Sequence, residues 1–142
     1  HVAEMRKTPG WEQVYIANNC SQIGPRATRI LESELICDRA AEAAKENEKE
    51  IVGWFGNCGA HNGMALSYRC LVPKKGENVL AAGRCVGAPD TIDTFRLICP
   101  CFVSGQAAGT AAALAARKGV TPRNLAYADL RRELERQKVW LG

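Results

Sequence analysis

The sequence predicts an α/β fold, and three observations predict it. Residues 51–55 (IVGWF) have the β-branched and aromatic composition of a short strand. The stretch 97–116 carries no formal charge and is rich in Gly, Ala, Ser and Thr, which predicts a buried helix. Leu130 and Leu134 lie four positions apart in the charged segment 125–137, as on the apolar side of an amphipathic helix. With 142 residues the chain fits one compact domain.

The first half of the chain predicts short elements between breakers. A helix tail at 2–8 ends at the Pro9-Gly10 pair. Asp38 can cap a helix that runs to about Lys49, whose mostly polar surface predicts an exposed position. The remaining elements expected here are strands at 14–17, within 22–35 after a turn at Gly24-Pro25, at 51–55 and at 67–72.

In the second half, the apolar run 79–83 (VLAAG) predicts a strand covered on both sides. In the helix that follows, Gly105, Gly109 and Ala113 recur every four positions, so we expect other backbone to approach that side closely. The same stretch is long enough to cross a membrane, but its polar residues favour a buried helix in a soluble protein. Gly119 predicts the end of the helix.

The net charge and the spacing of the cysteines disfavour some classes of function. The formal net charge of +4 is mild, and the chain has no basic stripe with interleaved aromatic residues, which disfavours a nucleic-acid partner. The seven cysteines include no CxxC pair, so we expect no metal site, and buried reduced thiols are expected instead. The absence of a signal peptide predicts a cytoplasmic chain. His1 opens a helix-like segment, which suggests a fragment, a processed product or a small subunit.

The passage from the strand at 79–83 into the long helix is where chemistry is expected. Gly83 has no side chain, so backbone there can approach a ligand. Pro100 lies near the helix start, where a missing N–H is harmless, and free N–H groups at that end favour an anionic or electron-rich ligand atom. The alternative is that the strand and the helix only pack together.

The motifs around this passage resemble a known family. Residues 79–87 (VLAAGRCVG), 96–101 (RLICPC) and 105–115 (GQAAGTAAALA) resemble the C-terminal FAD-contacting signature of FAD-dependent oxidoreductases distantly related to the succinate dehydrogenase and fumarate reductase flavoproteins. Residues 68–73 (YRCLVP) and 22–30 (QIGPRATRI) are similar to two further blocks of that family. The resemblance implies an enzyme that carries out two-electron redox of an organic small-molecule substrate, with FAD as cofactor.

The resemblance also implies site residues. Those expected to contact the flavin are Gly83, Arg84, Cys85, Arg96, Ile98, Cys99, Pro100 and Cys101. Those expected to act on the substrate are Arg96, His61 and Arg29; for His61 an exposed loop position, and for Arg29 a surface ion pair, are the alternatives. Two positions depart from the family: Arg84 stands where relatives carry an acid, and Pro100 is shifted by one position, so the N–H that would face the flavin is left open.

The sequence contains no GxGxxG turn, on which the pyrophosphate of a dinucleotide would rest. We therefore expect a C-terminal fragment of an FAD/NAD(P)-binding flavoprotein fold that lacks its N-terminal Rossmann unit. Its expected partner is a larger flavoprotein chain, or a missing region, with that turn; no membrane partner is expected. Residues 1–78 would form part of a substrate or cap region, and 79–142 the flavin-contacting part. The alternatives are a non-catalytic interaction subunit, or a small helical binding domain with an accidental match.

Overall fold

The computed structural model describes residues 1–18, 21–22, 24–26, 28–56 and 63–142. Helices dominate the described part of the chain, and they accompany one small sheet. The α-helices are α1 (Val2–Met5), α2 (Arg39–Ala43), α3 (Ile92–Phe95), α4 (Ile98–Lys118) and α5 (Tyr127–Arg136). Three 3-10 turns, η1 (Glu46–Glu48), η2 (Tyr68–Cys70) and η3 (Pro122–Asn124), join them.

The sheet is an antiparallel pair of β1 (Ile51–Phe55) and β2 (Met64–Ser67). The strand predicted at 51–55 is therefore confirmed. The register slips between Ile51 and Gly53, which places a bulge at the start of β1. Gly53 is required there by a close approach, because a Cβ at this position would lie 2.6 Å from Cγ1 of Val103 on α4.

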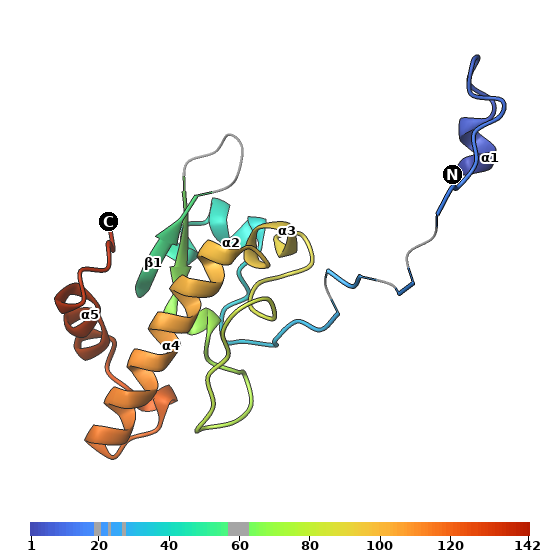
Figure 1. Ribbon diagram of the computed structural model, residues 1–142. Coiled ribbons are helices and arrows are strands. Elements are labelled where there is room, and N and C mark those ends of the chain that lie inside the picture. The colour runs from blue at the N-terminus through green and yellow to red at the C-terminus, as the bar shows by residue number, and fades with distance from the viewer. Residues whose placement is uncertain (19–20, 23, 27, 57–62) are drawn as a thin grey trace.

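Helix α4 is the central element, and it runs beside β1 with α5 packed against its second half (Figure 1). Its predicted end is confirmed: Gly119 adopts the left-handed conformation at φ 65°, and Arg117 and Lys118 occupy the last turn. Pro100 lies in the first turn, where an N–H would have no helical partner. Residues near each end of the helix therefore determine where it begins and where it ends.

The core forms where α4, α5 and the hairpin meet. It includes Val52, Leu66, Ala107, Ala111, Leu114, Leu130 and Leu134. Phe55 and Phe95 add an edge-to-face pair with ring centroids 5.2 Å apart. By contrast, none of residues 1–18 is buried, and α1 lies apart from the other elements (Figure 1).

Several predicted elements in the first half are wrong. Residues 14–17 form no strand, and the segment after Gly24-Pro25 makes only a single bridge, from Ser33 to Pro73. The helix from Asp38 stops at Ala43, although Asp38 does cap it, accepting from the Ala41 N–H at 2.7 Å. The predicted strand at 67–72 is a 3-10 turn instead, preceded by β2.

The predicted strand at 79–83 is also irregular in the chain. A strand needs a neighbouring strand to bond its backbone, and in the described part of the chain neither β1 nor β2 pairs with this segment. The Ala81 N–H does bond the Leu71 carbonyl at 2.9 Å, so this segment is held against the body without joining the sheet.

Helix α4 has the length and apolar composition of a membrane-crossing segment, with a mean hydropathy of 1.3 over its best window. One-third of that window is buried within the chain. Core helices of soluble proteins meet the same criterion, so this single helix is weak evidence for a membrane.

Candidate functional site

Ser104 joins the segment that ends at Gly83 to the first turns of α4. The Gly83 N–H donates to Ser104 Oγ at 2.9 Å, and Ser104 Oγ donates to the Pro100 carbonyl at 2.7 Å. Gly83 has φ 83°, a conformation that favours glycine, and a Cβ there would lie 3.8 Å from Cys101 Sγ. The structure therefore brings together the two segments that the sequence predicted to meet. We call Gly83, Ser104 and residues 98–101 the α4 niche.

The N-terminus of α4 is open. Leu97 provides no side-chain cap, and among the described residues the N–H groups of Ile98 and Cys99 have no backbone acceptor outside the helix. Ile98 is 71% exposed and Cys99 is exposed. The positive end of a 21-residue helix therefore has no partner in the part of the chain that the structure describes.

Arg96 lies directly before this helix end but is engaged elsewhere. Its Nη2 lies 3.2 Å from Oδ1 of Asp93, a residue of α3 whose side chain is 88% exposed. A pair with so exposed a carboxylate contributes little stability. The guanidinium is thus beside the niche and weakly held.

Arg84 and Cys85 bring a second segment to the niche. Arg84 Nη1 donates to the Pro25 carbonyl at 3.3 Å, and the Leu31 N–H donates to the Cys85 carbonyl at 2.7 Å. Pro25 and Leu31 therefore lie beside the turn at Gly83. Arg29, between these two residues in the sequence, is exposed, and no described contact ties its side chain to the niche. His61 lies outside the described residues.

The cysteines of the niche are free thiols. Cys101 and Cys85 are half-buried and make only weak sulfur contacts, to the carbonyls of Phe95 and Ala82. Away from the niche, a hydrogen bond with Cys70, together with burial, raises the pKa of the Cys37 thiol. Among the described residues no three His, Cys, Asp or Glu side chains gather as metal ligands.

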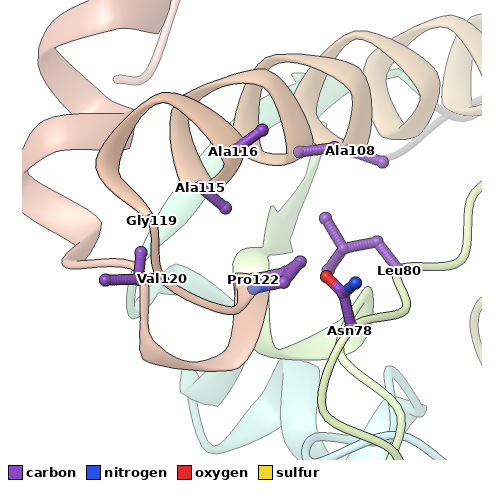
Figure 2. Close-up of a pocket in the computed structure, with 9 residues that line it drawn as sticks. Asn78, Leu80, Ala108, Ala115, Ala116, Gly119, Val120 and Pro122 are labelled. Atoms are coloured by element: carbon purple, nitrogen blue, oxygen red, sulfur yellow. The ribbon is translucent and has the colours of Figure 1, made fainter.

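A cavity of about 410 Å³ lies farther along α4 (Figure 2). Its walls are the alanines of the second half of α4, the coil at Asn78 and Leu80, and Pro122 of η3. Figure 2 shows the Asn78 amide and Leu80 across from Ala108 and Ala115. The sequence does not reveal this hollow, because its walls come from segments that are distant in the chain.

One side of α4 is exposed along its length, and its far end borders the cavity through Ala112 and Ala116. The residues on this side are Ile98, Phe102, Gly105, Gly109, Ala112 and Ala116, all exposed, and we call it the bare face. Phe102 is 72% exposed, and a Cβ on Gly105 or Gly109 would meet nothing within 4 Å. The expectation that other backbone approaches these glycines is therefore not met by the described residues of this chain.

Arg123 forms a separate cluster that fastens η3 to the body. Its guanidinium bonds the Glu34 carboxylate and the Pro73 carbonyl, and donates to the Gly76 carbonyl at 3.0 Å. These contacts, and the 3.4 Å approach of its Nε to Oε1 of Glu77, tie Arg123 to groups of this chain, so the cluster stabilises the fold.

Comparison with known proteins gives one positive finding. A family model described as FAD dependent oxidoreductase matches residues 44–134, which include β1, the hairpin, the α4 niche, α4 and most of α5. No curated protein and no solved structure matches the chain.

Proposed function

Because the chain belongs to the FAD dependent oxidoreductase family, we propose that it completes a flavin site together with a nucleotide-binding part that it does not itself contain. The assembled protein would catalyse two-electron redox of an organic substrate, as a relative of the succinate dehydrogenase and fumarate reductase flavoproteins. In this proposal it works in the cytoplasm, with no nucleic-acid or membrane partner.

The observation that carries the proposal is the open N-terminus of α4. Bound FAD would supply the hydride chemistry, and its reduction places negative charge on the pyrimidine end of the ring. The N–H groups of Ile98 and Cys99 and the positive end of the helix suit that charge. The residues present therefore fit one edge of a flavin.

The other residues of the niche serve orientation in this proposal. Gly83 leaves room for a ring because it has no side chain, and Ser104 holds its backbone on α4. Cys99, Pro100 and Cys101 form the first turn, and Arg84 and Cys85 continue the wall. Arg96 is placed to bind an anionic group of the substrate once it leaves Asp93, with Arg29 and His61 as further candidates.

The residues fit only part of FAD. The sequence has no GxGxxG turn for the pyrophosphate. Helix α4 has an exposed face, and the segment 79–83 has the composition of a strand but no strand partner among the described residues. Both features are expected when the elements that would pack against them belong to another part of the protein. A nucleotide-binding part, on the same polypeptide or on a companion, would cover both.

Replacing Ile98 by proline tests the proposed role of the helix end. Proline is favoured at the first helical position, and Leu97 already has the extended conformation that a following proline requires. Ile98→Pro therefore removes one N–H while keeping the helix. The matched control is Ile98→Ala, which removes the side chain and keeps the N–H.

We expect native mass spectrometry of the purified assembly to show FAD and the nucleotide-binding part together. Ile98→Pro should make the flavin reduction potential more negative by on the order of 30 mV, equivalent to about one hydrogen bond to a charged group. Ile98→Ala should change it much less. An assembly without FAD would support the non-catalytic subunit instead. Equal reduction potentials for the two variants would show that the N-terminus of α4 does not contact the flavin.

A further inference from the structure

A second cavity, of about 290 Å³, lies where η1 approaches the hairpin. It shares no residue with the α4 niche. Glu42, Asn47 and Glu48 line one side of it, and Trp54 and Met64 line the other. The cavity therefore has a polar, acidic wall opposite an apolar one.

Asn47 is the unusual residue of this cavity. It is only 2% exposed, and neither its Oδ1 nor its Nδ2 has a hydrogen-bond partner among the described residues. Buried side-chain amides are almost always partnered, so an exception needs an explanation. Lys45 and Glu50, which flank η1, both have left-handed backbone, at φ 56° and 53°. The turn that holds Asn47 inward is thus maintained at some conformational cost.

The charge around Asn47 is negative and uncompensated. Neither Glu42 nor Glu48 forms an ion pair within the described part of the chain, whereas Glu46 in the same turn pairs with Lys49 at 2.8 Å. Among the described residues, none that lines the cavity is basic. Carboxylates held near an unpartnered amide favour a cation that can also donate hydrogen bonds.

The opposite wall limits the ligand further. The Trp54 indole offers an aromatic surface, on which a cation can also rest. The Nδ2 of Asn47 requires an acceptor. The volume suits only a small molecule, at the lower end of the range for ligand sites.

We propose that this cavity binds a small organic cation, a protonated primary amine that also carries a neutral acceptor such as an amide. The ammonium group donates to Glu42, Glu48 and the Oδ1 of Asn47. The Nδ2 of Asn47 donates to the ligand's acceptor, and an apolar stem packs on Trp54 and Met64. The proposal does not involve the flavin, so it stands or fails separately from the proposed function.

The direct test is calorimetric titration of the full chain, in the assembly in which it purifies, with leucinamide. The matched control ligand is 4-methylpentanamide, which keeps the stem and the amide but lacks the ammonium group. We expect saturable binding of leucinamide that weakens with salt, and binding of the neutral amide at least about tenfold weaker.

Variants separate a site from a merely acidic surface. Glu48→Gln and Glu42→Gln should each weaken leucinamide binding several-fold, whereas Glu46→Gln, outside the cavity, should leave it unchanged. Asn47→Leu should abolish binding and raise the denaturation midpoint, because it replaces an unpartnered buried amide by an apolar group of similar shape.

Three results would overturn the proposal. Absence of saturable heat with leucinamide would show that the cavity holds water only. Equal affinities for leucinamide and 4-methylpentanamide would show that the ammonium group is not recognised. A lowered denaturation midpoint for Asn47→Leu would show that Asn47 has structural partners, in which case it is not free to bind a ligand.

Discussion

The two sides of α4 have similarly small residues but very different surroundings. On one side Ser104, Ala107, Ala111 and Leu114 are buried against β1, α5 and the Gly83 turn. On the opposite side the bare face is exposed: Phe102 and Ile98 are 72% and 71% exposed, and a Cβ on Gly105 or Gly109 would meet nothing within 4 Å. A large exposed apolar stripe on a helix indicates a surface that another element covers. One side of the helix is thus packed within this chain, and under the proposed function the other side is covered by the nucleotide-binding part.

The largest effect should come from the packed side. Leu134 of α5 is fully buried against it, so Leu134→Ala should lower the free energy of unfolding by about 2–5 kcal/mol. Phe102→Ala, on the bare face, should change it by no more than about 0.5 kcal/mol in the chain alone. Urea denaturation of both variants measures this difference, and equal losses would mean that the bare face is packed within the chain.

The link between Gly83 and α4 should rank second. Ser104→Ala leaves the Gly83 N–H without its acceptor in a buried position, so a loss of about 1–3 kcal/mol is expected. Thr110→Ala, which removes a half-buried hydroxyl bonded only to Gln137, is the control and should cost less. If the two variants unfold at the same urea concentration, Ser104 does not hold the niche together.

Alkaline pH should lower the free energy of unfolding through ionisation of Tyr68. Its hydroxyl donates to the Pro122 carbonyl at 2.8 Å, and burial, aided by Glu34 and Glu50, raises its pKa to about 12. The unfolded phenol ionises near pH ~10, so this stabilisation is complete below that pH and is lost as the pH rises toward 12. Tyr68→Phe should flatten the fall in stability between these pH values. An unchanged slope would place the alkaline sensitivity elsewhere.

The smallest effect should come from the bare face itself. Gly109 is in the middle of α4 and has open space where a Cβ would lie, so Gly109→Ala should stabilise the chain by about 1 kcal/mol. Ala111→Gly, on the buried side, is the opposite change and should destabilise. A destabilising Gly109→Ala in the isolated chain would show that this face is already occupied.

The sequence predicted the second half of the fold better than the first. The limits of α4 follow from Pro100 and Gly119, and the apolar spacing of Leu130 and Leu134 predicts α5, because these signals are local. The strand predicted at 79–83 is absent for a different reason: its composition suits a strand, but strand formation depends on a neighbouring strand, and the described residues place none beside it.

The candidate site shows the same division. Gly83 and the first turn of α4 meet as the motifs implied, and the family match covers them. Ser104, which joins them, was missed because a single serine in a small-residue helix gives no signal until its partner is known. Asn47 was missed because burial of a polar residue in a short turn is set by tertiary packing.

The most direct test of the account is the effect of Phe102→Asp on flavin content, with Phe102→Leu as the matched control. We predict that Phe102→Asp leaves the unfolding free energy of the chain nearly unchanged but separates it from the nucleotide-binding part, so that the purified protein loses its FAD; Phe102→Leu should retain both. Full FAD content and intact assembly in Phe102→Asp would contradict the claim that this face of α4 is covered in the working enzyme.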